Sequence, residues 1–299
     1  MLPKSSGWTD WAHCGQFATR NSQFLHNHVV KVSLSAAILV AILGAAGAGL
    51  WYRYQLDQQH DATGEVGFSA ADDEWLEHLY SQNPKIAEEA TQHVKALGAE
   101  ALPTLQAALD DPAADPQRKK AAFKAVGILG TTAAPLVGHV AEHLPDPALT
   151  AEAAVALSFM GRDAFEPLRD ALDSDDPVLR AEALRSIGKL RERAPLDARA
   201  VIPLLQRGMG DPDAGVRTVA ATYLGIIAES PETSVPILIA ALKDDSPEVR
   251  AAAATALGSF PSAAAEAIPA LRRATGDKNP DVAREAGVSL VKLQGSGIR

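Results

Sequence analysis

The sequence predicts an all-α protein: an alpha solenoid of repeated helical hairpins, preceded by one transmembrane helix. Three observations lead to this prediction. A two-part helical phrase recurs through most of the chain, the apolar residues are mainly small, and one uncharged stretch near the N-terminus is long enough to cross a membrane. Of the 299 residues 47% are hydrophobic but only 5% are aromatic, a balance that suits close packing between stacked helices.

The clearest copy of the phrase runs from Asp176 to Leu190. Asp176 followed by Pro177 favours a helix start, because the carboxylate can accept orphan backbone N–H groups and proline fits the first turn. Apolar residues at positions 183, 184, 187 and 190 then share one helical face. The second half contains Pro203, which we expect in the first turn of a second helix. Each copy therefore predicts a helical hairpin.

The copies keep a common register along the chain. A capping residue followed by proline recurs at Asn83, Asp115, Asp146, Asp176, Asp211, Ser246 and Asn279. The proline of the second half recurs at Pro103, Pro135, Pro167, Pro203, Pro236 and Pro269. A basic residue stands in several first helices, at Lys119, Arg180, Arg217, Arg250 and Arg284, and eight residues beyond the first four come Gly127, Gly188, Gly225 and Gly258. We expect these glycines to let neighbouring helices approach closely.

The pattern D-P-x-V-R-x-x-A-x-x-A-L-G, then A-x-P-x-L-x-x-A-L-x-D, resembles HEAT repeats, and most nearly the bacterial HEAT-like repeats of phycobilisome lyases. The resemblance covers residues 83–299 and implies a right-handed alpha solenoid. It also implies a ladder of aspartate–arginine pairs between adjacent hairpins, to which Asp176, Asp211 and Asp245 with Arg180, Arg217 and Arg250 correspond. Thr150 and Ala87 replace the arginine in earlier copies, so the ladder is expected to be broken toward the N-terminus.

The sequence divides the chain into five segments. These are an N-terminal cytoplasmic segment (1–31), a transmembrane helix (32–52), an acidic linker (53–67), a capping helix (68–82) and the solenoid (83–299), with six hairpins and a terminal helix. The terminal helix, about Asp281–Leu293, is expected to be a polar cap; the alternative is an apolar strip of Val288, Leu290 and Val291 that binds another protein.

The stretch Val32–Tyr52 contains no charged residue, and about 20 apolar residues span a bilayer. Lys4, Arg20 and Lys31 precede it and only Arg53 follows directly, which predicts a cytoplasmic N-terminus and a periplasmic or extracellular solenoid. The alternative is a cleaved signal peptide and a secreted solenoid. Small residues within the span weakly favour a homodimer through the transmembrane helix.

The composition offers little for nucleic acids or cofactors. A net charge of −9 provides no basic surface for nucleic acid, and the single cysteine, Cys14, excludes an internal disulfide. His139 and His143 lie one helical turn apart, a spacing that can present two imidazoles to a metal. Because no third ligand is evident, we expect solvated or capping histidines, with no metal and no cofactor.

The resemblance implies that the second helices line a concave surface that binds other proteins. Candidate residues for this surface follow the second-half prolines: Gln106, His139, Asp170, Gln206, Arg207, Arg272 and Arg273. The expected function is a membrane-anchored protein-interaction scaffold or adaptor without catalytic residues. The alternative is an enzyme or enzyme subunit of the HEAT-repeat lyase or hydroxylase (oxidoreductase) type. It is disfavoured because the chain contains no His-Glu dipeptide, the metal motif of the di-iron hydroxylases.

Overall fold

The computed structural model describes residues 73–194 and 196–296. The segments expected at 1–31, 32–52 and 53–67 lie outside these residues, as does the beginning of the expected capping helix. All described elements belong to one compact unit, Val66–Arg299, and the description below concerns this unit alone.

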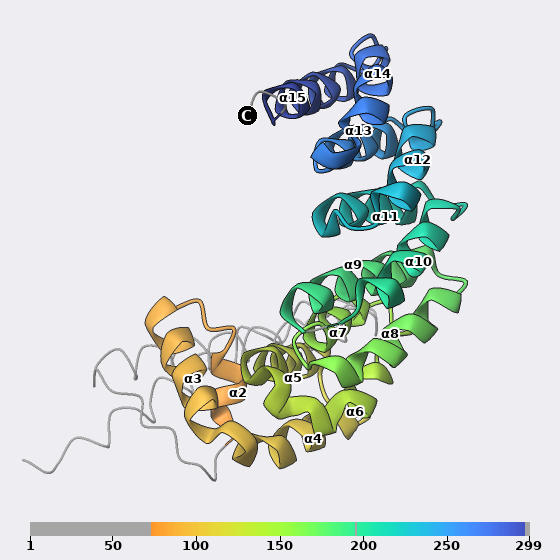
Figure 1. The fold of residues 1–299 in the computed structure, drawn as a ribbon. Coiled ribbons are helices and arrows are strands. Elements are labelled where there is room, and N and C mark those ends of the chain that lie inside the picture. The colour runs from red at the N-terminus through yellow and green to blue at the C-terminus, as the bar shows by residue number, and fades with distance from the viewer. Residues whose placement is uncertain (1–72, 195, 297–299) are drawn as a thin grey trace, which may run out of the picture. The chain divides into compact units, whose positions relative to one another are not determined.

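Within the described residues every regular element is a helix, and the helices alternate between two layers (Figure 1). The first helices of the hairpins are α3 (Pro84–Leu97), α5 (Pro116–Leu129), α7 (Thr150–Leu157), α9 (Pro177–Arg193), α11 (Ala214–Ile227), α13 (Pro247–Leu257) and α15 (Pro280–Ser296). The second helices are α4 (Leu102–Asp110), α6 (Val137–Ala141), α8 (Phe165–Asp170), α10 (Ala198–Met209), α12 (Pro231–Ala241) and α14 (Ala264–Ala274). Short 3₁₀ turns connect or extend several of them: η1 (Gly98–Ala101), η2 (Gly130–Leu136), η3 (Arg162–Ala164), η4 (Ala171–Asp173) and η5 (Pro261–Ala263).

Most of the predicted helix starts are confirmed by side-chain caps. Asn83, Asp115, Asp176 and Ser246 each accept a hydrogen bond from a backbone N–H in the first turn of the helix that follows. Two starts were predicted wrongly. Asp213, not Asp211, caps α11, and Asp146 accepts from the N–H of Ala148 in a loop before α7.

The second-half prolines occupy the expected first turn in α4 and α8, where Pro103 and Pro167 are the second and third helical residues, but not in the later hairpins. Pro203, Pro236 and Pro269 lie inside α10, α12 and α14, beyond the first residues of these helices. The reason is visible in α10, where Asp197 accepts a hydrogen bond from the N–H of Arg199 at 2.9 Å and so starts the helix before the proline. The prediction placed the start of the helix at the proline, because proline favours the first turn, and missed the capping aspartate upstream of it.

A short helix covers the first hairpin. α2 (Glu74–His78) contacts α3 and α5, and Trp75, Leu76 and Leu79 are completely or almost completely buried there. These three residues form an apolar face that covers the first repeat. Tyr80 is 45% exposed, and the ammonium of Lys124 lies 4.6 Å from the centroid of its ring.

One described stretch, Pro116–Ala141, is long and apolar enough to cross a membrane by length and composition. It is part of the solenoid core, where Ala122, Phe123 and Val126 are buried. Gly130, with a φ of +58°, ends α5 and starts the turn η2 toward α6. These contacts account for its apolar composition through packing between hairpins.

Candidate interaction surfaces

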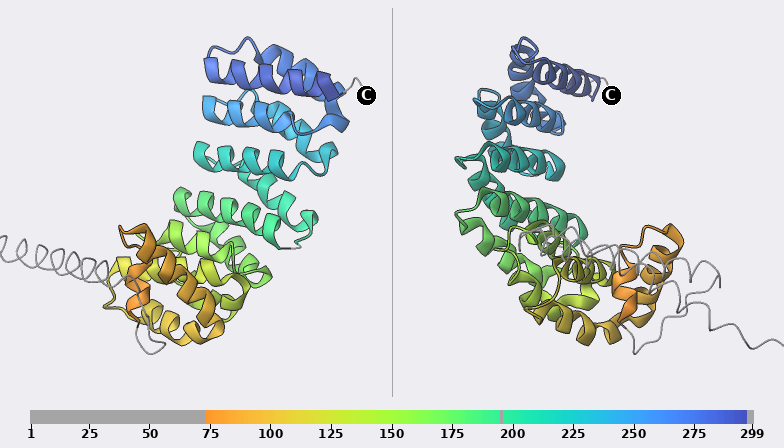
Figure 2. Two further views of the ribbon diagram at one scale, coloured as in Figure 1. Left: turned by 90° about the vertical axis from the view of Figure 1, so that its left-hand side faces the viewer. Right: turned by 180° about the vertical axis from the view of Figure 1, so that it is seen from behind.

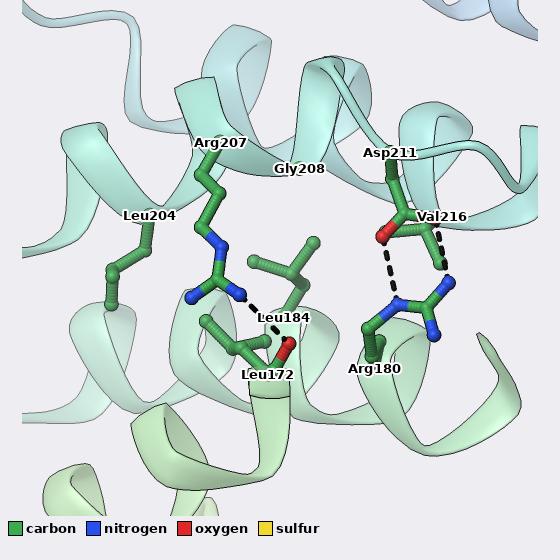
Figure 3. Close-up of a pocket in the computed structure, with 8 residues that line it drawn as sticks. All are labelled: Leu172, Arg180, Leu184, Leu204, Arg207, Gly208, Asp211 and Val216. Atoms are coloured by element: carbon green, nitrogen blue, oxygen red, sulfur yellow. Dashed lines mark hydrogen bonds and ion pairs between the residues drawn. The ribbon is translucent and has the colours of Figure 1, made fainter. Parts of the chain in front are cut away.

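Three arginine–aspartate rungs connect four consecutive first helices. In each rung the guanidinium of one repeat forms a two-pronged ion pair with an aspartate of the next, with all nitrogen–oxygen distances between 2.8 and 2.9 Å. The pairs are Arg180–Asp211, Arg217–Asp244 and Arg250–Asp277. Figure 3 shows the first of them beside a small cavity.

The same arginines also close the loops of their own repeats. Nη1 of Arg217 donates to the carbonyls of Asp211 and Pro212, each at 2.9 Å, and Arg180 and Arg250 make the corresponding pairs of bonds. On the other side, the Asp244 carboxylate accepts the N–H of Ser246. Hydrogen bonds from arginine hold the pKa of Asp211, Asp244 and Asp277 below the usual aspartate value. Each rung therefore joins two loops as well as two side chains.

The expected ladder is confirmed for its three arginines but was wrong for two of its aspartates. Asp176 is a helix cap that accepts from the N–H of Val178 at 2.9 Å, and the partner of Arg217 is Asp244, not Asp245. The ladder position lies two residues before the cap, where its carboxylate also accepts the cap's own N–H, as Asp211 does from Asp213. The ladder residue and the helix cap lie only two residues apart and are often both acidic, so the sequence pattern did not distinguish them.

The ladder stops between α7 and α9 because both members of that rung are replaced together. Thr150 stands at the arginine position, and its hydroxyl still donates to the carbonyls of Leu144 and Asp146 at 2.8 Å. Ser174 stands at the aspartate position, and its hydroxyl accepts the N–H of Asp176 at 3.1 Å. The bonds within each loop are kept, whereas the ion pair between the loops is lost.

Glycines set the distance between the first helices. A Cβ added to Gly225 would lie 2.5 Å from Cα of Ala256, and one added to Gly258 would lie 2.6 Å from Oγ of Ser289. A Cβ at Gly188 would overlap the ring of Tyr223 at 2.1 Å. The expectation of close approach is confirmed at these three positions. It was wrong for Gly127, whose added Cβ would meet Phe159 at an ordinary 3.7 Å.

The first helices, not the second, line the inner side of the bend within this unit. Figure 1 and the right-hand view of Figure 2 place α9, α11, α13 and α15 toward the inside and the second helices outside, and the left-hand view of Figure 2 looks onto the first helices. The contacts agree, because neighbouring first helices pack tightly while the second helices are spread further apart. The expected concave surface of second helices was therefore wrong. Glycine at the contact positions shortens the stack on the side of the first helices and so bends it toward them.

The seven candidate residues lie on the second helices, on the outer side of the bend. Gln106, Asp170, Arg207, Arg272 and Arg273 are exposed, and His139 and Gln206 are partly buried. Two local groups form, one around Asp110 and one around Arg207; Arg272 and Arg273 lie apart from both, on α14. The structure does not bring the seven together into one site.

The two histidines tie α6 to α4. Nδ1 of His139 lies 2.7 Å from Oδ1 of Asp110, whose other oxygen accepts from Gln106 at 3.3 Å. Nε2 of His143 lies 3.0 Å from the carbonyl oxygen of Leu109, and its ring packs edge-on against Phe123. His143 thus caps the C-terminal end of α4 as expected, and His139 is a hydrogen-bond partner of Asp110 that the sequence did not predict.

Arg207 is held over the end of the preceding hairpin. It donates to Asp173 at 2.6 Å and to the carbonyl of Leu172 at 3.3 Å. The cavity beneath it has a volume of about 20 Å³, room for about one water molecule, and Figure 3 shows Leu172, Leu184 and Leu204 around it. An adjoining depression of about 500 Å³ lies over the Arg180–Asp211 rung. The N–H groups of Arg180 already donate to Asp211 and to two loop carbonyls. The depression therefore offers charged groups for contact with a partner, not a side chain that could react with a substrate.

Across residues 73–194 and 196–296, no group of three or more His, Cys, Asp and Glu side chains is placed to hold a metal ion.

At the end of the stack, Val288 and Val291 of α15 are 58% and 69% exposed. The apolar alternative for this helix therefore describes these two valines better than the polar cap does, although Arg284 and Lys292 are exposed beside them.

Comparison with known proteins identifies the repeats. A family model described as HEAT repeats matches residues 139–225, 165–245 and 235–296, which together cover more than half of the chain. No curated protein sequence matches the chain.

Several solved structures are similar to this one. YibA from Escherichia coli is 20% identical, with a TM-score of 0.52, over 72% of this chain and 79% of that one. Kap121p is 12% identical, with a TM-score of 0.55, over 70% of this chain but only 28% of that longer one. Human deoxyhypusine hydroxylase is 20% identical over 74% of this chain and 83% of that one, with a TM-score of 0.37. These likenesses concern the fold. By its repeats, the chain belongs to the HEAT-repeat family.

Proposed function

We propose that this chain is a membrane-anchored scaffold or adaptor that binds other proteins through its HEAT-repeat solenoid. The observation that carries the proposal is the stack itself. Each hairpin adds one helix to each of two layers, and most of the outward-facing side chains of both layers are solvent-exposed or half-buried. Such a stack offers an extended surface to partners instead of an enclosed pocket.

The anchor is supported by the sequence. The uncharged stretch Val32–Tyr52 has the length of a membrane span, and the basic residues before it favour a cytoplasmic N-terminus. The proposal therefore places the solenoid on the periplasmic or extracellular side, and the phycobilisome-lyase type of repeat is part of the same proposal.

Two experiments test this function. Cross-linking in intact membranes, followed by purification of the full chain, should recover the same partner proteins reproducibly, and their absence would refute the scaffold. A topology reporter fused after Arg299 should be active outside the cytoplasm; activity inside the cell would overturn the orientation. Iron or zinc bound stoichiometrically to the purified chain would instead favour an enzyme of the hydroxylase type.

A further inference from the structure

The inner face of the stack carries few charges on α11 and α13. Its outward positions on α3, α5 and α9 carry charged side chains such as Glu88, Lys124 and Arg185, and α7 carries one charged residue, Glu152. On α11 the only charged residue is Arg217, and on α13 only Glu248 and Arg250 are charged. Both arginines are engaged in the ladder. Two adjacent helices thus present an inner face with no charged side chain beyond their first turns.

We call the inner face of α11 and α13, with the adjoining face of α15, the uncharged strip. Large apolar side chains are exposed on it. Ile226 of α11 is 51% exposed and Val288 of α15 is 58% exposed, although both are large aliphatic side chains. On the same face of α11 as Ile226, the hydroxyls of Thr218 and Thr222 donate to carbonyls of their own helix at 2.8 Å. On α13, the hydroxyl of Thr255 donates to the carboxylate of Glu285 of α15 at 3.1 Å. Since these hydroxyls are already bonded, the threonines are left with their methyl groups to offer a partner. Exposed apolar side chains grouped on one face are typical of interaction sites.

Two lysines border the strip at the same register. Lys189, Ile226, Ser259 and Lys292 stand thirteen residues after the capping residues Asp176, Asp213, Ser246 and Asn279. Lys189 is half-buried on α9 and Lys292 is exposed on α15. Within residues 73–194 and 196–296 neither ammonium forms an ion pair. This row across the inner face therefore begins and ends with a lysine, and a large apolar residue and a small residue lie between the two lysines.

We propose that this strip binds an extended segment of a partner protein that is uncharged and apolar in its middle and acidic at both ends. Packed helices lie about 8–10 Å apart, so the three steps from Lys189 to Lys292 span roughly 25–30 Å. An extended chain rises about 3.3 Å per residue, which places the two acidic residues about eight positions apart. The inference rests on the proposed scaffold function and names its surface and its partner chemistry.

Charge complementarity selects this occupant over others. Carboxylates at the two ends would meet the unpaired lysines, whereas a charge in the middle would lose its water against Ile226 and the threonine methyl groups without gaining a partner. A basic segment would be repelled at both ends.

The test uses the full chain and a fluorescent nine-residue peptide with glutamate at each end and seven uncharged alanine, valine and threonine residues between. Fluorescence anisotropy should show saturable binding. Reversing both lysines, Lys189→Glu with Lys292→Glu, should weaken binding at least about tenfold, and a lysine-ended peptide should then bind this variant. The matched control, Arg199→Glu with Lys243→Glu on the second-helix layer, exchanges two exposed cations in the same way and should bind the acidic peptide as the parent does. Circular dichroism checks that both variants are folded.

The outcomes separate the inference from the function on which it rests. Absence of saturable binding by the acidic peptide, or equal weakening by the control variant, overturns the strip as the site. If the strip variant also keeps every complex cross-linked in membranes while the control variant loses them, the scaffold function stands and its surface is the outer layer. If the parent chain forms no complexes in membranes, the scaffold function itself fails, whether or not the peptide binds.

Discussion

Replacing Gly225 with alanine gives the sharpest test of how the first helices pack. In a helix interior, alanine is favoured over glycine by about 0.5–1 kcal/mol, so helix propensity alone predicts stabilisation. The structure predicts the opposite. The new Cβ would lie 2.5 Å from Cα and 2.6 Å from Cβ of Ala256, well inside the 3.5–4.0 Å of a normal carbon contact.

The atom in the way belongs to the backbone of α13, so no rotamer change removes the overlap. The two helices must separate by about 1 Å or more, and overpacking of this kind costs about 1–3 kcal/mol. After the helix-propensity gain is subtracted, we expect a net loss of about 1 kcal/mol and at most about 2.5 kcal/mol, read as a lower urea midpoint by circular dichroism at 222 nm.

Gly287→Ala provides the matched control, because an added Cβ on this α15 residue meets nothing within 4 Å and should stabilise the helix by about 0.5–1 kcal/mol. If Gly225→Ala unfolds at the same or a higher urea concentration than the parent chain, the close approach of α11 and α13 and our account of the bend are both wrong.

Three further predictions concern the ladder and the cap. Arg250→Gln removes one member of an ion pair whose side chains are only 6% and 13% exposed and should cost about 2–3 kcal/mol in urea unfolding. Arg284→Gln, 63% exposed, should change the urea midpoint much less because water screens its ion pairs; equal losses would contradict the rung's role. Because arginine bonds lower the folded pKa of Asp211, Asp244 and Asp277, their contribution is complete above the unfolded aspartate pKa of about 3.9 and is lost as pH falls through the lowered values. Acid unfolding should therefore set in below about pH 4, and Arg217→Gln should flatten this pH dependence; an unchanged profile would refute the linkage. Trp75→Ala, which empties a site only 1% exposed, should cost about 3–5 kcal/mol in thermal unfolding, against little for the half-exposed Tyr80→Ala, and a small effect at Trp75 would show that α2 does not stabilise the first hairpin.

The hairpins could be predicted from the sequence because their signals are local. A cap followed by proline, as at Asp176 and Pro177, specifies a helix start because it acts on the backbone of the residues that directly follow it. Partners in different repeats could not be predicted in this way. Asp244 and Asp245 are adjacent acids, and only the path of the loop decides that the first receives Arg217. The tie from His139 to Asp110 likewise depends on how α4 and α6 are placed.

The direction of the bend was predicted wrongly although its signal was present. Glycines at fixed register occur in the first helices, at Gly188, Gly225 and Gly258, and each permits contact with the next first helix. Among the described second helices, glycine occurs only as Gly138 of α6 and Gly208 of α10. An added Cβ would meet nothing at Gly138, and at Gly208 it would meet side chains of first helices, not another second helix. Comparing the two layers for small residues would have indicated which layer is the more compressed, and hence which one faces inward.

The paired replacement at Thr150 and Ser174 divides the stack into sections of unequal cooperativity. From α9 to α15 each repeat is linked to the next by a buried charge pair and two loop carbonyls, so these repeats should open together. Between α7 and α9 such a link is lacking, and the side-chain bonds that cross this interface, from Arg193 to Ser158 and from Arg207 to Asp173, come from more exposed arginines. In a linear array whose stability is set by neighbours, the weakest junction is where separation begins. Under mechanical tension, or while the chain emerges from the ribosome, we expect residues 73–173 and 174–296 to behave as two folding units that part at this junction.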